Sequence, residues 1–144
     1  MIVNKIAILS PGDMGHAVGR ALSEHGFDIL THLEGRSQRT CALAKDAGFR
    51  ISATLNELIH EADLLLSILV PASAETVAKE IAQSLQETGE TTLIADCNAI
   101  SPMRSERIGR TIESAGGRYI DASIIGHPPG QDAPPRFYVS GHYA

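Results

Sequence analysis

The fold of this chain is decided near its amino terminus, where the sequence reads Ile6-Ala7-Ile8-Leu9-Ser10-Pro11-Gly12-Asp13-Met14-Gly15. Four apolar residues ended by a turn predict a buried strand, and apolar residues at helical spacing after the turn predict a helix. The turn stands where dinucleotide-binding folds have G-x-G-x-x-G, with Ser10 replacing the first glycine. There Gly12 would let the backbone approach a pyrophosphate, and Gly15 would allow close helix–strand contact. We therefore predict that residues 10–15 bind a cofactor; the alternative is a plain tight turn, and Asp13 is an unexpected neighbour for phosphate.

The rest of the chain alternates short apolar runs with stretches of helical periodicity. We expect strands at 6–9, 28–33, 49–51, 64–70, 91–96, 119–121 and 137–139. We expect helices at 14–25, 38–47, 55–61, 74–85 and 102–114, and an irregular segment at 126–135. This order predicts an α/β, Rossmann-type doubly wound, mainly parallel sheet with helices on both faces. Ligands of such sheets bind at the carboxyl ends of the strands.

Length and composition limit the possible classes of protein. The chain has 144 residues, 43% of them hydrophobic, which supports one domain with its own core. A formal net charge of -5 and an aromatic content of 4%, without tryptophan, argue against a nucleic-acid partner. Cys41, Cys97 and the six histidines show no spacing typical of a disulfide framework or metal site. Without a targeting segment or an apolar run of about 20 residues, we expect a cytoplasmic protein and no membrane partner.

The loop after the second expected strand combines a carboxylate with an anion-binding cluster. Glu34 follows the glycines at about the 20-residue distance at which an acidic side chain usually bonds the adenosine ribose of NAD. Arg36, Ser37 and Arg39 lie in the same loop, and a guanidinium with a hydroxyl suits a 2′-phosphate better. We therefore predict NADP as the preferred cofactor, with NAD as the alternative. A solvated charged turn without a ligand is the other interpretation.

The first turn also resembles the G-x-G-x-M-G turn of the β-hydroxyacid dehydrogenase and 6-phosphogluconate dehydrogenase superfamily, and four further segments match in order. These are Leu66–Pro71, similar to an apolar strand closing on a proline; Asp96–Pro102, similar to D-x-S-T-I-S-P; Asp121–Gly126, similar to D-A-P-V-S-G; and Phe137–Gly141, similar to the strand that ends the cofactor domain. Because the resemblance covers nearly the whole chain, residues 1–144 are identified as a member of the family's amino-terminal NAD(P)-binding domains.

The resemblance implies further site residues. Those beside the cofactor would be Val70, Pro71 and Asn98; those close to the substrate would be Ser123, Ile125, Gly126 and His127. Asn98 would approach the nicotinamide ribose, and the alternative is an Asx-type turn residue that prepares the next helix. The sequence departs from the family pattern at Ile125, where a substrate-contacting serine is expected, and at His127, where a glycine is expected. The identity of the substrate is therefore not carried over.

In this superfamily a second, all-helical domain supplies the catalytic lysine, much of the substrate pocket and most of the dimer interface. We expect that domain to be absent from this chain, and a homodimer only where it is present. Lys5 is expected in a strand, and Lys45 and Lys79 on solvent-facing helix positions. No catalytic base is therefore predicted, and His127 beside two prolines is more simply an incidental loop residue.

Three functions remain open at this point. The first is the cofactor half of an NAD(P)-dependent oxidoreductase that transfers hydride between NADP(H) and a small hydroxy acid or related carbonyl compound, and this chain alone is expected to be inactive. The second is a non-catalytic dinucleotide-binding sensor or scaffold. The third is an S-adenosylmethionine-dependent transferase, since such enzymes also use a glycine-rich first turn. The expected partner is a small-molecule substrate.

Overall fold

The structure is a computed structural model that describes residues 2–10, 12–130 and 134–144. Its strands are β1 (Lys5–Leu9), β2 (Asp28–Thr31), β3 (Arg50–Ile51), β4 (Leu64–Ser67), β5 (Leu93–Asp96), β6 (Arg118–Ile125) and β7 (Arg136–Ser140). Its helices are α1 (Asp13–Glu24), α2 (Gln38–Asp46), α3 (Leu55–Glu61), the short 3₁₀ turn η1 (Pro71–Ser73), α4 (Ala74–Thr88) and α5 (Pro102–Ser114). None of the described helices is long and apolar enough to cross a membrane.

The strands form one sheet in the order β3-β2-β1-β4-β5-β6-β7. Every neighbouring pair is parallel except β6 and β7, which form an antiparallel hairpin at the edge. The chain begins in the middle of the sheet, builds outward to β3, and then returns to β4 on the other side of β1. β1 and β4 stay paired to their last residues, Leu9 and Ser67, but the chain then turns to α1 on one face and to α4 on the other. The two connections separate at this point, which creates the crevice where doubly wound folds bind ligands. The predicted fold class is confirmed.

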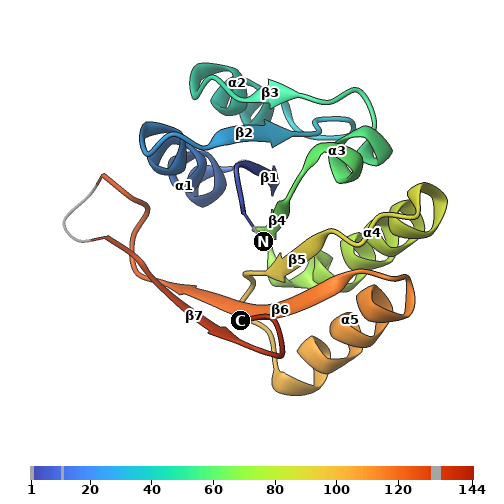
Figure 1. The fold of residues 1–144 in the computed structure, drawn as a ribbon. Coiled ribbons are helices and arrows are strands. Elements are labelled where there is room, and N and C mark those ends of the chain that lie inside the picture. Colours follow the sequence, from blue (N-terminus) through green and yellow to red (C-terminus); the bar gives the residue numbers. More distant parts are fainter. Residues whose placement is uncertain (1, 11, 131–133) are drawn as a thin grey trace.

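Helices cover the two faces of the sheet unequally (Figure 1). On one face α3, α4 and α5 pack over a core that includes Leu65, Ile81 and Ile112. On the other face α1 and α2 cover only the β1–β3 half, over a core that includes Ile8 and Phe49. Each face thus has its own hydrophobic core, and the sheet separates the two.

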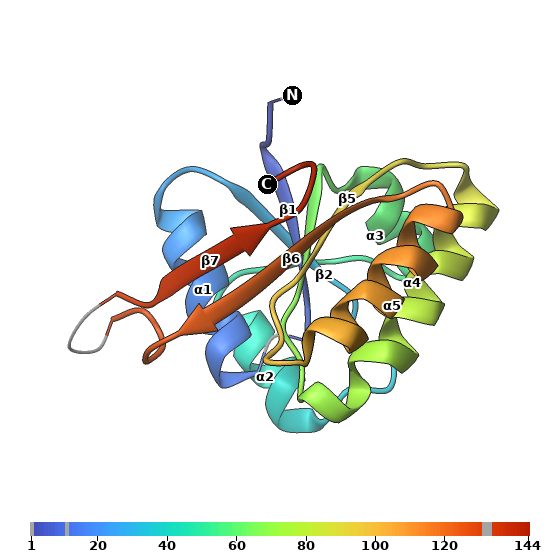
Figure 2. The same ribbon diagram turned by 90° about the horizontal axis from the view of Figure 1, so that it is seen from below.

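The half of the second face beyond α1 holds an apolar trough of about 450 Å³. Its floor consists of side chains from β4, β5 and β6, and its rim of α1, β7 and the prolines near the hairpin. The lining includes Leu22, Leu66, Leu93, Ala95, Cys97, Ile120, Pro129, Pro135 and Phe137. Figure 2 shows β7 at the outer edge of the sheet and the β6–β7 hairpin reaching past α1. This strip of sheet has apolar side chains, and none of the described helices packs over it.

Two glycines bring α1 unusually close to β1. A Cβ atom at Gly15 would lie 2.7 Å from the Ser10 carbonyl oxygen and 3.3 Å from Ile8 Cγ2. One turn later, a Cβ atom at Gly19 would overlap the Phe49 ring and lie 2.9 Å from Ile8 Cδ1. The close helix–strand contact predicted for Gly15 is therefore present, and Gly19 extends it along the helix.

Three strands end two or more residues away from their predicted last residues. β2 ends at Thr31 and β4 at Ser67, each before its apolar run ends, because the chain leaves the sheet at the crevice. Beyond Ser67 the Leu69 amide donates to the Asn98 side chain at 2.6 Å instead of to a strand partner. In contrast, β6 continues to Ile125, since its second half pairs with β7. Residues 123 and 125, expected in a loop, thus lie on a strand.

The contact around Gly19 gives a prediction about stability. Gly19→Ala should destabilise the fold, because overpacking a core typically costs about 1–3 kcal/mol while alanine returns only about 1 kcal/mol of helix propensity. We expect a net loss of roughly 1–2 kcal/mol in the free energy of unfolding, measured by urea denaturation followed by circular dichroism. Combining the change with Phe49→Leu should recover part of the loss as a favourable coupling energy. Strictly additive effects of the two substitutions would contradict this explanation.

Candidate functional site

The turn between β1 and α1 offers several backbone amides to a ligand. Gly12 is the N-cap of α1, its side-chain position has no protein atom within 4 Å, and no side chain caps the helix. The His16 amide closes the first helical bond to the Gly12 carbonyl at 2.8 Å. The amides of Asp13, Met14 and Gly15 have no acceptor among the described residues, as expected for the first turn of a helix. Open space, free amides and a helix N-terminus together form a cradle for an anion. Pro11, also predicted here, lies outside the described residues.

Asp13 is no longer an unexplained neighbour of this cradle. Its carboxylate accepts a hydrogen bond from Arg39 Nη2 at 2.5 Å, which ties the start of α1 to α2. The hydrogen bond and charge of the Arg39 guanidinium hold the pKa of Asp13 below its usual value. The negative charge beside the turn is therefore offset within the protein, and Arg39 is removed from the predicted anion-binding cluster.

A cavity of about 340 Å³ opens at the carboxyl ends of β1 and β2. One wall comes from β1 and the β2–α2 loop, and the other from α3 and α4. The cavity is lined by Leu9, His32, Glu34, Arg36, Leu55, Asn56, Glu80, Gln83, Ser84 and Glu87. The structure thus brings the predicted residues Glu34 and Arg36 to one cavity, which Leu9 at the end of β1, just before the anion cradle, also lines.

The predicted loop residues differ in what their side chains do. The Ser37 hydroxyl accepts a hydrogen bond from the Thr40 amide at 3.1 Å and is the N-cap of α2. Arg36 is half-buried, and its guanidinium has no hydrogen-bond or ion-pair partner within the described part of the chain. Glu34 is exposed and lies 3.6 Å from His32 Nε2. Of the predicted cationic pair, only Arg36 remains available to an anion.

The α3–α4 wall of this cavity was not predicted from the sequence. Ser84 donates to Asn56 Oδ1 at 2.6 Å, and Glu87 accepts from the amides of Asn56 and Gln83 at 2.9 Å each. These hydrogen bonds lower the pKa of Glu87. The α4 residues recur at positions 80, 83, 84 and 87, which is the spacing of one helix face. The polar residues on this face of α4 are the sequence signal for the wall.

The predicted residues after β4 and β5 lie on the other side of the crevice. Val70 is 66% exposed, and Pro71 follows it at the surface. Asn98 is only 3% exposed, and its Oδ1 accepts a hydrogen bond from the Leu69 amide at 2.6 Å. The Asx-type bond at this turn belongs to Asp96, whose Oδ1 accepts from the Asn98 amide at 2.9 Å. Asn98 therefore joins the ends of β4 and β5, and burial raises the pKa of Asp96 beside it.

The predicted substrate-proximal residues lie along the end of β6 and in the loop after it. Asp121 pairs with Asp96 at the end of β5, so the half of β6 that contains Ser123 and Ile125 extends beyond that strand. Ile125 is 61% exposed, Gly126 has a φ of +123°, and His127 is exposed. These residues present a surface beside the crevice, and none of them lines the 340 Å³ cavity.

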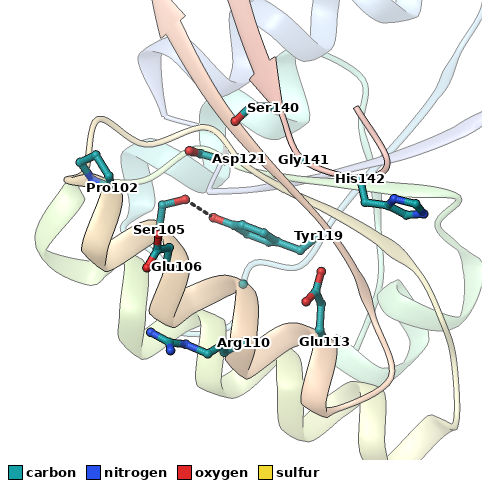
Figure 3. Close-up of a pocket in the computed structure, with 11 residues that line it drawn as sticks. Pro102, Ser105, Glu106, Arg110, Glu113, Tyr119, Asp121, Ser140, Gly141 and His142 are labelled. Atoms are coloured by element: carbon teal, nitrogen blue, oxygen red, sulfur yellow. Dashed lines mark hydrogen bonds between the residues drawn. The ribbon is translucent and has the colours of Figure 1, made fainter.

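A separate cavity of about 510 Å³ lies between α5, β6 and the end of β7. Figure 3 shows Tyr119 lying across α5 with its hydroxyl toward Ser105, and the two hydroxyls are hydrogen bonded at 2.9 Å. Gly109 makes room for this ring, since a Cβ atom there would lie 2.8 Å from Tyr119 Cδ1. None of the predicted site residues lines this cavity. In the described part of the chain, no group of three or more His, Cys, Asp or Glu side chains is placed to hold a metal ion.

The crevice is chemically suited to an elongated anionic ligand. The amides of the first turn that have no acceptor among the described residues suit a phosphate, and Arg36 supplies positive charge. The 340 Å³ cavity has apolar side chains, Leu9 and Leu55, that suit a flat group. Lys45 and Lys79 are exposed on their helices and Lys5 lies in β1, as expected.

Comparisons with known proteins agree with this geometry. A family model described as the NAD binding domain of 6-phosphogluconate dehydrogenase matches residues 5–144. The mitochondrial 3-hydroxyisobutyrate dehydrogenase of Mus musculus is 24% identical over 123 residues, which cover 84% of this chain and 36% of that protein. The 3-hydroxyisobutyrate dehydrogenase of Mycobacterium tuberculosis, solved with L-serine, shares the fold with a TM-score of 0.82 at 22% identity, covering 97% of this chain and 47% of that one.

A third similar protein is the imine reductase of Myxococcus stipitatus. Its complex with NADP+ has a TM-score of 0.67 at 18% identity, covering 87% of this chain and 42% of that one. A variant in complex with NAD+ has a TM-score of 0.76 at 21% identity, covering 98% and 47%. This chain spans less than half the length of each of these relatives.

The Asp13–Arg39 pair predicts how the turn responds to a change of charge. Asp13→Asn should raise the affinity for inorganic pyrophosphate roughly two- to fivefold, because it removes a negative charge from the helix N-terminus and releases Arg39. Isothermal titration calorimetry measures the change. Since the pKa of Asp13 is lowered, its carboxylate becomes protonated only at a lower pH than an ordinary aspartate. The difference between the two proteins should therefore persist from neutral pH to about pH 5; equal affinities at neutral pH would contradict the assignment.

Proposed function

The chain belongs to the family of NAD binding domains of 6-phosphogluconate dehydrogenase, and from this premise we propose that it binds NADP(H) in the crevice for hydride transfer to a small substrate. The observation that carries the proposal is the first turn of α1, where the amides of Asp13, Met14 and Gly15 have no acceptor among the described residues. This turn follows β1, whose last residue, Leu9, lines the cavity that contains Arg36. In a dinucleotide the pyrophosphate is attached to an adenosine. An anion cradle with a cavity for a flat ring near it therefore suits this ligand. The family match favours it over S-adenosylmethionine.

Each part of the crevice has a part of the dinucleotide to hold. The amides of Asp13, Met14 and Gly15 would bind the pyrophosphate, and Gly12 would leave space for it. The adenosine would occupy the 340 Å³ cavity between the β2–α2 loop and α4. The nicotinamide half would then extend past the crevice to the β4–β5 side, where Val70, Pro71 and Asn98 lie.

The preference for NADP over NAD rests on Arg36. Its guanidinium lines the adenosine cavity without a partner among the described side chains, whereas Arg39 is neutralised by Asp13. A 2′-phosphate beside Arg36 would also lie near the N-terminus of α2, which Ser37 caps. Glu34, Glu80 and Glu87 line the same cavity and disfavour an anion there, so the guanidinium must lie closer to the phosphate than they do. Relatives of this fold have been solved with either nucleotide.

The proposed reaction is reversible hydride transfer with a small hydroxy acid or related carbonyl compound. The bound nicotinamide supplies the hydride chemistry, and the role of this chain is to hold and orient it. The 24% identical 3-hydroxyisobutyrate dehydrogenase supports this class of substrate. The end of β6, with Ser123 and His127, would present the substrate side of the crevice. The proton-transfer group is not assigned to any residue of this chain, and a non-catalytic nucleotide sensor is the alternative.

Substitution of Arg36 tests the cofactor preference. Arg36→Ala should weaken NADPH binding roughly ten- to a hundredfold, the equivalent of one or two charge-assisted hydrogen bonds, and change NADH binding less than threefold. The fluorescence emission of the reduced nicotinamide measures both affinities directly. Lys45→Ala, which removes a cation from the exposed side of α2, is the matched control and should change neither. An equal loss for both cofactors would contradict the phosphate assignment.

A turnover assay tests whether this chain by itself completes a catalytic site. If the chain is the cofactor half of an oxidoreductase, it should bind NADP+ in the presence of saturating 3-hydroxy acids. The rate of NADP+ reduction should not exceed the rate in buffer without the protein. Absorbance of the reduced nicotinamide follows the reaction. Nucleotide reduction by this chain alone would show that its own residues complete the catalytic site and would exclude the sensor.

A further inference from the structure

The segment between β4 and α4 is held in place from three directions. It leaves the sheet at the crevice and carries Val70 and Pro71, which are exposed. On the β1 side, the Ile68 amide donates to the Leu9 carbonyl at 2.6 Å. On the β5 side, the Leu69 amide donates to Asn98 Oδ1 at 2.6 Å. The third direction is α5, and it involves a residue with no role assigned so far.

That residue is Arg104, in the first turn of α5. Its Nη2 donates to the Pro71 carbonyl at 2.8 Å, and its Nε donates to Glu75 Oε1 at 3.0 Å. A single planar guanidinium thus binds the loop and the first turn of α4 together, which a lysine ammonium cannot do with the same fixed geometry. The side chain is about one-third exposed, so it is partly shielded from solvent.

Glu75 is the anchor that orients this guanidinium. Its carboxylate is also bound by Arg107 Nη2 at 2.8 Å, and Arg107 and Arg104 together hold the pKa of Glu75 below its usual value. The carboxylate therefore stays ionised over the neutral range. Only Arg104 continues to the loop: Arg107 shares the same carboxylate but has no hydrogen bond to Pro71.

We infer that Arg104 is a positioning residue, which acts through the Pro71 carbonyl to fix the Val70–Pro71 loop against the nicotinamide half of the bound dinucleotide. This inference rests on the proposed function. The adenosine cavity lies on the β1–β2 side of the crevice, and none of its lining residues belongs to the segment from Val70 to Glu75. Arg104 should therefore affect only the binding of the nicotinamide half of the ligand, and Arg36 only the binding of its adenosine half.

Fragments of the cofactor test this division. Arg104→Gln should weaken NADPH binding roughly five- to tenfold, about the net contribution of one ordinary hydrogen bond, because the lost bond acts on the ligand only through the loop. The same variant should bind 2′,5′-ADP, which lacks the nicotinamide half, within about twofold of the unaltered protein. Emission of the reduced nicotinamide measures the first affinity and isothermal titration calorimetry the second. Arg104→Lys, which keeps the charge but loses the fork, should give an intermediate loss for NADPH alone.

Arg107→Gln is the matched control, since it removes a guanidinium from the same carboxylate and leaves the Pro71 bond in place. It should bind both ligands like the unaltered protein, and circular dichroism establishes that each variant is folded. Equal losses for NADPH and 2′,5′-ADP in Arg104→Gln, or an equal effect of Arg107→Gln, would overturn the positioning role. Unchanged NADPH binding in Arg104→Gln would overturn it too. If the unaltered protein bound neither ligand, the proposed function itself would fail and this role with it.

Discussion

The contact between α1 and β1 is the constraint on which the rest of the structure depends. Because Gly15 and Gly19 have no side chains, the helix lies directly against Ile8 and the carbonyl of Ser10. This closeness sets the first turn of α1, with its unpaired helix-terminal amides, at the end of the central strand. The connections after β1 and β4 leave on opposite faces of the sheet at the same place, so the anion cradle lies at the crevice. The position of the site is thus set by how closely α1 packs against β1.

Charge pairs then hold the loops that surround this cradle. The Asp13–Arg39 pair joins α1 to α2, and the Glu75–Arg104 pair joins α4 to α5. Both lie at the surface, where a single pair contributes little to the free energy of unfolding. Their effect is on geometry and local potential: one pair offsets a negative charge beside the cradle, and the other fixes a loop at its far side. An ion pair that contributes little to the free energy of unfolding can therefore still position the groups that surround a ligand site.

The sequence predicted the fold well because its signals were local. The glycines of the first turn, the capping serine at 101 and the apolar run at 64–67 each specify an element from a few neighbouring residues. Strand ends were less accurate, since they depend on pairing partners distant in the chain, such as Asn98 for Leu69 and β7 for β6. The same limit applies to the site. Glu34 and Arg36 were detectable from their distance to the glycines, but the α4 wall and Arg104 approach them only through tertiary packing.

The apolar trough beside α1 has a consequence for how this protein is handled. Dyes that fluoresce in apolar surroundings, such as anilinonaphthalene sulfonate, normally report loss of structure because folded domains offer them few sites. Here the native sheet itself offers a site of about 450 Å³. Fluorescence should be high before heating and should fall as the strands separate, the reverse of an ordinary melting curve. The sulfhydryl of Cys97 lies in the same trough, and burial raises its pKa to about 12. Thiol labelling of this position would therefore report opening of the sheet rather than surface reactivity.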